Sequence, residues 1–396
     1  KHSIALVFMN VIWVYVLCLV VMVIGDCTDG PHRHIQVSSG IGNCDVSPSV
    51  YEYSEFLRKQ RTVSHPPTKL SFSENGKFKI AVFTDLHYGE GENVSWGPQQ
   101  DKNSTIAMKS YLHHESPDFV VFNGDQITGN NIMYNATTYW NELLQPVLEF
   151  QTPWGIIFGN HDDLSSGPGE TRADLMAFDS SYEYSFSRAG PTDIHGVSNY
   201  YLPVYGYNST IPETILYFLD SGGGDEQPSQ IFPDQINWYK NVSNSITEQY
   251  GKIIPSIAFF HIPLPESMKA WNEVECIGSK NESVVCQDLD LGTFDAFVSQ
   301  GDIKMTVSGH NHKNDYCCPI QGIYVCYARH SGYGGYGPHA PWIQGSRIIE
   351  LSLDNSNTWS VDSWIRIEDG TIDYGVPHTP CTDSNCDNQK FCGRDF

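Results

Sequence analysis

The segment Ala81-Val-Phe-Thr-Asp85-Leu-His87 decides the fold class, because it places a carboxylate and an imidazole directly after a run of apolar residues. A short apolar run that ends in a polar cluster predicts a buried strand followed by a loop. In α/β folds, the loops at the carboxyl ends of strands are where side chains from distant parts of the chain assemble into a site. The rest of the sequence repeats this arrangement.

Four further segments place metal-binding residue types after an apolar run: Val121-Phe-Asn-Gly-Asp125, Ile157-Phe-Gly-Asn160-His161-Asp162, Phe259-Phe-His261 and Val307-Ser-Gly-His310-Asn-His312. Each segment alone is weak evidence, since Gly-Asp pairs and single histidines are common in loops. Glycines at Gly124, Gly159 and Gly309 allow tight turns where the side chains must converge. Together the segments predict a metal site with nitrogen and oxygen ligands, which suits Fe, Zn or Mn.

Short apolar runs follow one another from Lys77 and predict buried strands. They are Phe78–Phe83, Phe119–Phe122, Gly155–Phe158, Thr214–Leu219, Ile254–Phe260 and Ile303–Val307. Three segments between them have helical length and spacing, with Asp234 as an expected N-cap: Thr138–Phe150, Asp234–Glu248 and Leu291–Gln300. The last runs have no helix between them and predict an antiparallel meander: Gly322–Tyr327, Arg347–Leu353 and Trp359–Ile367. The alternation of strands and helices indicates an α/β fold.

The sequence divides into four parts. Residues 1–25 contain an apolar run from Ile4 to Ile24, which predicts a signal peptide or, because it is long enough to span a bilayer, a retained signal anchor. We expect an N-terminal extension at residues 26–73, one large domain at residues 74–369, and a Cys-rich surface tail at residues 370–396. We therefore expect a secreted or lumenal protein, for example extracellular or in a vacuole or lysosome; a retained anchor would make it a single-pass membrane protein.

The eleven cysteines suit disulfides in an oxidising compartment. Cys317 and Cys326 flank a predicted hairpin turn, where facing positions are close enough for a disulfide. Weaker expectations pair Cys27 with Cys44, and two of Cys381, Cys386 and Cys392. N-linked glycans are expected at Asn-x-Ser/Thr sequences, which occur at Asn93, Asn103, Asn135, Asn208, Asn241 and Asn281.

The charge of the chain makes nucleic acid an unexpected partner. Its 23 basic and 46 acidic residues give a formal charge of −23, and the basic residues are scattered. An acidic chain also repels phosphate substrates unless a local positive charge offsets its field, which bound cations would supply. The acidity therefore favours a metal over an arginine clamp.

The order of the five segments resembles the calcineurin-like metallophosphoesterase superfamily, from residue 78 to about residue 352. Within it, the Phe-Thr-Asp85-Leu-His87 segment and Gly309-His-Asn-His-Lys-Asn-Asp resemble a purple-acid-phosphatase-like subgroup. The resemblance implies a four-layer αββα sandwich, in which helices flank two mixed sheets and the metal site lies at the strand-end loops.

The resemblance also implies a ligand set for two metal ions: Asp85, His87 and His312 for one, Asn160, His261 and His310 for the other, and Asp125 between them. Purple acid phosphatases have a tyrosine ligand three residues after the bridging aspartate, and here Thr128 takes that position. The purple colour should then be absent, with His87 filling the vacant coordination position.

Two cations about 3.5–4 Å apart can hold a bridging hydroxide as the nucleophile. The expected reaction is the hydrolysis of phosphate monoesters, on a small molecule or a protein, with His161 as general acid oriented by Asp162 or Asp163. Alternatively, His161 only binds a phosphate oxygen. A phosphodiesterase or pyrophosphatase on the same site, and a non-catalytic metal-binding glycoprotein, remain open. Arg329, His330 and Gly332-Tyr-Gly-Gly-Tyr-Gly could line the pocket.

Overall fold

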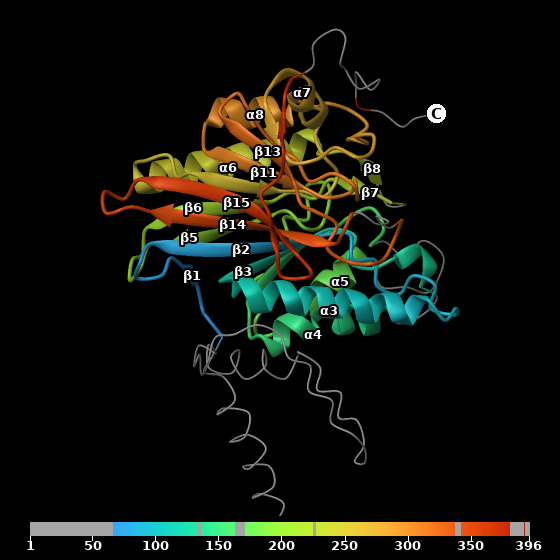
Figure 1. Ribbon diagram of the computed structural model, residues 1–396. Helices are drawn as coiled ribbons and strands as arrows, with labels where there is room; N and C mark the ends of the chain where they lie inside the picture. The colour runs from blue at the N-terminus through green and yellow to red at the C-terminus, as the bar shows by residue number, and fades with distance from the viewer. Residues whose placement is uncertain are drawn as a thin grey trace, which may run out of the picture. The chain divides into compact units, whose positions relative to one another are not determined.

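The computed structural model describes residues 66–132, 136–162, 171–224, 227–336, 342–380 and 392. Two large mixed sheets dominate these residues (Figure 1). The nine-stranded sheet has the strand order β1-β5-β6-β9-β11-β13-β12-β10-β17, and the six-stranded sheet has the order β16-β15-β14-β2-β3-β4. A separate pair consists of β7 (Gly222–Gly223) and β8 (Gln227–Ser229).

The nine-stranded sheet contains β1 (Leu70–Ser71), β5 (Tyr200–Tyr205), β6 (Pro212–Phe218), β9 (Ser256–Phe259), β10 (Cys276–Ile277), β11 (Ile303–Ser308), β12 (Cys317–Ile320), β13 (Ile323–Tyr327) and β17 (Pro377–His378). The six-stranded sheet contains β2 (Lys77–Phe83), β3 (Phe119–Asn123), β4 (Trp154–Ile157), β14 (Gly345–Leu353), β15 (Trp359–Ile367) and β16 (Ile372–Asp373). Strands β2, β3 and β4 run parallel, as do β6, β9, β11 and β13.

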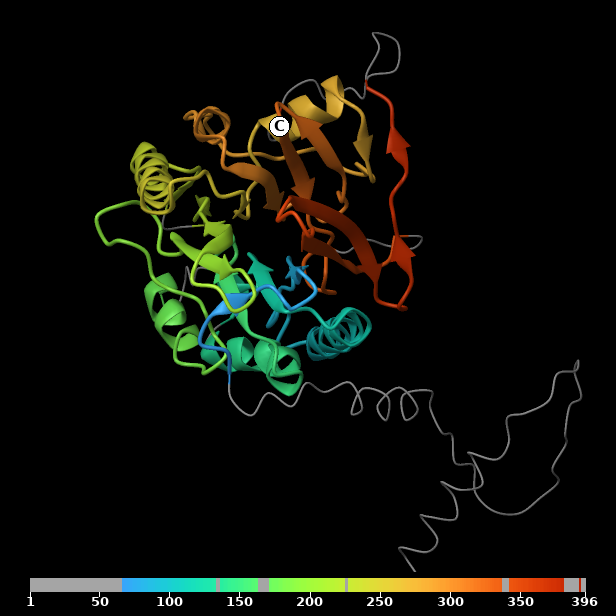
Figure 2. The ribbon, with the colours of Figure 1, turned by 90° about the vertical axis from the view of Figure 1, so that its left-hand side faces the viewer.

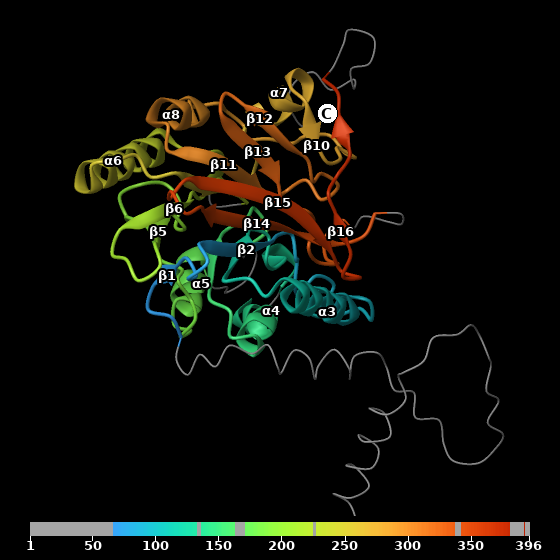
Figure 3. The same ribbon diagram turned by 60° about the vertical axis from the view of Figure 1, so that its left-hand side comes forward.

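Helices cover the outer face of each sheet (Figures 2 and 3). The six-stranded sheet is covered by α3 (Gly97–Glu115), α4 (Ala136–Glu149) and α5 (Arg172–Asp179), and the nine-stranded sheet by α6 (Pro233–Tyr250), α7 (Glu266–Glu273) and α8 (Thr293–Gln300). In β6, Leu216 and Phe218 belong to the hydrophobic cluster that also contains residues of the six-stranded sheet. Ile215 and Tyr217 belong to a second hydrophobic cluster, which lies under α6, α7 and α8. This alternation follows from the two-residue period of a strand. The predicted four-layer sandwich is confirmed.

Each predicted strand and helix lies within a few residues of an observed one. Two other predictions, the meander and an N-cap, differ from the structure. The predicted meander is correct for its last two runs, because β14 and β15 pair antiparallel, but wrong for Gly322–Tyr327, because β13 lies in the other sheet and pairs parallel with β11. The predicted N-cap Asp234 lies inside α6, whose N-cap is Phe232. Helix α3 was not predicted, because its buried apolar side chains occupy only its C-terminal half: Ala107, Met108, Tyr111 and Leu112.

The structure moves two predicted boundaries. Strand β1 lies in the predicted extension of residues 26–73 but pairs with β5. Strands β16 and β17 lie in the predicted tail of residues 370–396 but pair with β15 and β10. Residues 1–25 and the expected Cys27–Cys44 pair lie outside the described residues, and none of the described helices is long and apolar enough to cross a membrane.

The predicted Cys317–Cys326 disulfide is confirmed, since these residues are cross-strand partners in β12 and β13. A second disulfide, Cys276–Cys318, joins β10 to β12 and was not predicted. The potential glycan acceptors Asn93, Asn208, Asn241 and Asn281 are exposed, Asn103 is half-buried, and Asn135 lies outside the described residues.

Candidate metal centre

The parallel strands bring the predicted ligand residues to one edge of the sandwich. Loops after β2, β3 and β4 of one sheet meet loops after β9 and β11 of the other. Two groups have ligand atoms within 4.8 Å of one another: Asp85, His87 and His312, and Asp125, His261 and His310. The first group is the one that the resemblance implied, and the second contains His261 and His310 of the other implied set together with Asp125.

Asp125 of the second group also lies close to the first group. Its Oδ2 is 3.0 Å from Nε2 of His261 and 3.6 Å from Nε2 of His87. The side-chain oxygen of Asn160 is buried, and no described residue is within hydrogen-bonding distance of it. An unpaired buried amide oxygen is costly, so a bound cation would satisfy it.

Hydrogen bonds fix the orientation of three imidazoles. Nδ1 of His261 donates to the backbone oxygen of Asn123 at 2.9 Å, and Nδ1 of His312 to that of Tyr336 at 2.8 Å. The third, His87, has Nδ1 3.0 Å from the Thr128 hydroxyl. A proton on Nδ1 leaves the lone pair on Nε2, the atom that would bind a metal.

The Nε2 atom of His87 is buried without a hydrogen-bond partner among the described residues, and the buried Nε2 atom of His261 faces the Asp125 carboxylate. Burial lowers the pKa of His87 to about 3, so its imidazole is neutral, as a ligand must be. Burial also lowers the pKa of His261, but the Asp125 carboxylate outweighs this and raises it to about 9. A cation would replace that proton. The donor set therefore fits two metal ions.

The ligand loops have an unusual backbone. Asp85, His87, Asp125 and His310 all have positive φ values, between 52° and 71°. Residues other than glycine adopt this conformation at a cost of about 1–3 kcal/mol, and it concentrates at functional sites. Of the three glycines expected to allow turns, only Gly124 has a positive φ.

The other two glycines provide space instead. A Cβ at Gly159 would collide with Asp125, and one at Gly309 with Thr84. Both positions therefore need glycine because two ligand loops pass close together there.

Thr128 contacts His87, the residue that the resemblance implies as a metal ligand in place of the missing tyrosine. Its hydroxyl lies 3.4 Å from the backbone oxygen of His87, to which it donates, and accepts from Nδ1 of the same residue. The residue that stands where purple acid phosphatases have tyrosine thus orients an imidazole.

His161 lies beside the ligand groups without belonging to either. Its ring centre is 5.0 Å from that of His87, and its backbone N–H donates to Oδ1 of Asp125 at 2.8 Å. Its Nδ1 lies 3.4 Å from the side-chain oxygen of Asn130. Asn130 was not identified in the sequence, because nothing near it in the chain indicates this contact.

The expected orientation of His161 by Asp162 is wrong. The buried Asp162 carboxylate accepts from backbone N–H groups of Gly159 at 2.7 Å, Ile127 at 3.0 Å and Asp125 at 3.1 Å. It therefore ties the loop after β4 to the loop after β3. Asp163 lies outside the described residues.

The buried Arg172 also stabilises the loop after β4 through hydrogen bonds. It donates to Oδ1 of Asp220 at 2.7 Å and to the backbone oxygens of Gly159 at 2.8 Å and Gly223 at 3.1 Å. It begins α5 after the Thr171–Asp174 capping box. That capping box was a sequence signal for the helix, but not for the role of the arginine.

Replacing Arg172 by methionine should lower the free energy of unfolding by about 3–5 kcal/mol, because Asp220 would be left as a buried, unpaired charge. Urea unfolding followed by circular dichroism would measure the change. The matched control is Lys252→Met, which breaks a surface pair with Glu213 and should cost about 1 kcal/mol or less. Equal urea midpoints for Arg172→Met and Lys252→Met would contradict the stabilising role of Arg172.

A cleft of about 330 Å³ opens over the ligand groups. Its lining residues are His87, Glu90, Asp125, Thr128, Asn130, Asn131, His161, Val285, His310, Asn311, His312, Gly335 and Tyr336. None of these is lysine or arginine, so the described lining offers no cationic side chain for a phosphate, apart from its imidazoles. Metal ions would have to supply most of the positive charge.

Part of the expected glycine-rich loop lines this cleft. Tyr336 stacks on His312 with ring centres 4.0 Å apart, and Gly335 packs against the same imidazole. Arg329 does not line the cleft, because it pairs with Asp315 and Asp373. His330 is fully buried behind His312.

A layered sandwich with two potential ligand groups at its strand ends defines this protein as an α/β protein with a candidate metal centre. Residues 78–314 match the model of the calcineurin-like phosphoesterases, and the chain belongs to this family.

Two relatives and one solved structure extend the comparison. Probable inactive purple acid phosphatase 28 of Arabidopsis thaliana is 30% identical over 347 residues, which cover 78% of this chain and 85% of the plant protein. Phosphatase DCR2 of Saccharomyces cerevisiae is 30% identical over 358 residues, which cover 80% of this chain and 59% of the yeast protein. A dimetal phosphatase from Danio rerio superposes with a TM-score of 0.50 at 13% identity, covering 77% of this chain and 99% of the fish protein. At that identity, the last comparison supports the fold alone.

Proposed function

We propose that this protein is a metal-dependent phosphatase that hydrolyses phosphate monoesters at a two-metal centre. The observation that carries the proposal is the convergence of the imidazoles of His87, His312, His261 and His310 on the carboxylates of Asp85 and Asp125, with His161 outside both groups on the same cleft. A purely structural metal site has no need of a free imidazole. The name of the plant relative contains the word inactive, but here every expected ligand residue is present.

The ligand residues would hold the ions, and the remaining residues would handle the substrate. When bound, two cations neutralise phosphoryl oxygens and lower the pKa of water. In the protonated imidazole of His161, Nδ1 donates to Asn130, which leaves the Nε2 proton for the leaving-group oxygen of the ester. The Asp125 carboxylate accepts a hydrogen bond from the backbone N–H of His161. This contact positions the ligand residue Asp125 and the proposed general acid His161 together.

The substrate would be a small-molecule or protein phosphoester, without nucleic acid as a partner. A phosphodiesterase or pyrophosphatase on the same site is the second candidate, because its ligand set would be the same. The two disulfides support an extracellular or lumenal location, with N-linked glycans and with membrane attachment only if residues 1–25 are retained.

The test is the turnover of a chromogenic phosphomonoester and of the matching diester at several pH values, together with metal analysis and a visible spectrum. We expect close to two metal ions per chain, faster hydrolysis of the monoester, and no intense visible band, because Thr128 replaces the tyrosine. A purple protein would contradict the assignment of Thr128. Metal-loaded protein without turnover of either ester would contradict the proposed function and favour the alternative of a non-catalytic metal-binding glycoprotein.

A further inference from the structure

The cysteines of the described region divide into two disulfides and two free thiols. Cys276–Cys318 and Cys317–Cys326 are bonded, whereas Cys286 and Cys392 are not. Both free cysteines are half-buried and pack against the hydrophobic cluster under α6, α7 and α8, to which Cys276 and Cys318 also belong. Two bonded and two free cysteines therefore share one cluster.

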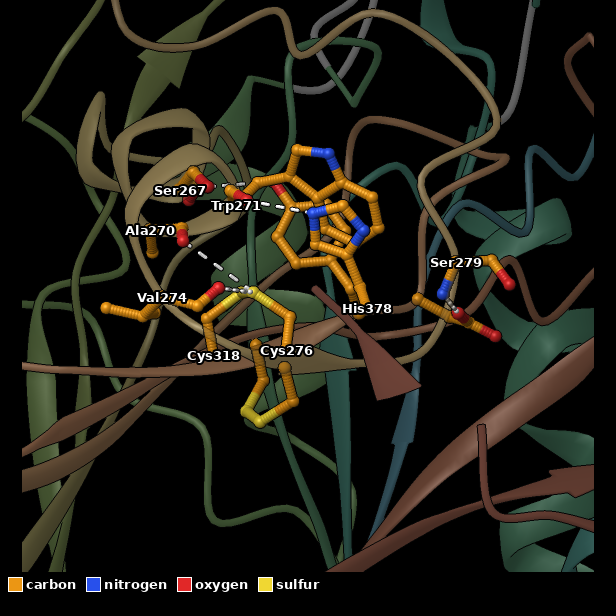
Figure 4. Close-up of a disulfide and its surroundings, with 12 residues drawn as sticks. Ser267, Ala270, Trp271, Val274, Cys276, Ser279, Cys318 and His378 are labelled. Atoms are coloured by element: carbon orange, nitrogen blue, oxygen red, sulfur yellow. Dashed lines mark hydrogen bonds between the residues drawn. A yellow bond between two sulfur atoms is a disulfide. The ribbon is translucent and has the colours of Figure 1, made fainter. Parts of the chain in front are cut away.

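The C-terminal segment contacts both ends of α7. At the C-terminal end of the helix, the His378 ring stacks on Trp271 with centres 3.6 Å apart, next to the Cys276–Cys318 disulfide (Figure 4). At the other end, Sγ of Cys392 lies 3.8 Å from the backbone oxygen of Pro265, the residue before α7.

Cys286 reaches the same end of α7 from a different part of the chain. The next residue, Gln287, donates from its backbone N–H to the oxygen of Pro263 at 3.0 Å and from its side chain to that of Ile262 at 3.0 Å. The Cys286 and Cys392 side chains interact directly; this contact and burial raise the pKa of Cys392. The two thiols are neighbours in space although 106 residues separate them in the sequence.

We propose that Cys286 and Cys392 form a third disulfide, which fastens the C-terminal segment to the loop before α7. The two thiols together lose two protons and two electrons as the sulfur–sulfur bond forms. A disulfide oxidant of the secretory lumen accepts the electrons and becomes a dithiol, as the formation of the other two disulfides also requires.

The crosslink would stiffen one wall of the cleft. Val285, the residue before Cys286, lines the cleft, and Pro263 follows the ligand residue His261 by two positions. The disulfide would thus join the last part of the chain to a segment that borders the metal centre. This inference does not depend on the proposed reaction.

Trypsin digestion of the unreduced full chain tests the pairing, because the cysteines fall in separate peptides. Cleavage after lysine and arginine places Cys286 alone in peptide 281–304, Cys392 alone in peptide 391–394, and Cys381 with Cys386 in peptide 367–390. After removal of any glycan at Asn281, mass spectrometry at acidic pH should find peptide 281–304 bonded to 391–394. The bond should disappear on reduction.

Two results would overturn the proposal: complete alkylation of Cys286 and Cys392 in the unreduced, unfolded protein, or a bond between peptides 367–390 and 391–394. The second result would support the pairing expected from the sequence. As a further check, Cys286→Ser and Cys392→Ser should each lower the Tm by about 5 °C, because each frees the same long loop. The double variant should match the single ones, and additive losses would contradict a shared bond.

Discussion

The Asp125→Ala variant should lose its metal ions and more than about 10³-fold of its phosphatase activity. Asp125 lies within 4 Å of imidazoles from both ligand groups, so its removal weakens both sites at once. Without a cation, the pKa of water is not lowered, so water is a poor nucleophile at neutral pH. Metal content and turnover would be measured on the same preparation.

Two further variants separate the loss of metal from a loss of structure. Asp125→Asn can keep the hydrogen bond from the His161 backbone but lacks the charge, and it should also lose metal. Asp193→Ala removes an exposed aspartate and should behave as the wild type. Turnover by metal-free Asp125→Ala protein would contradict the proposed function.

The His161→Ala variant should keep its metals, because His161 belongs to neither ligand group. Its kcat should fall by about 10²–10⁴-fold for esters with alkoxide leaving groups, the range expected for one positioned proton donor. A nitrophenolate leaves without a proton, so the loss should shrink as the leaving-group pKa falls. The measurement is kcat across a series of phosphomonoesters.

The matched control is His195→Ala, which removes an exposed histidine paired with Asp234 and should not change kcat. Asn130→Ala should reproduce part of the His161→Ala loss, because it frees the Nδ1 side of the imidazole. An equal loss across the leaving-group series, with metals retained, would leave His161 as a donor to a phosphate oxygen rather than the general acid.

Much of the fold and the ligand residue types could be predicted from local sequence. A buried strand is recognised from its own apolar run, and the residue that follows it must lie at the strand end. The spacing of Asp85 and His87 after β2, or of His310 and His312 after β11, is therefore local information. The Cys317–Cys326 pair was predictable for the same reason, since a tight hairpin fixes its cross-strand partners.

What the sequence could not determine were contacts between residues that are distant along the chain. Arg172 under Gly159, Asn130 beside His161, and the contact between Cys286 and Cys392 depend on how separate loops pack. The same is true of the sheet in which β13 lies. Hydrophobic periodicity specifies which face of a strand is buried, but not its partner, because several partners can bury the same face. Tertiary packing alone decided which atoms of the predicted ligands face one another.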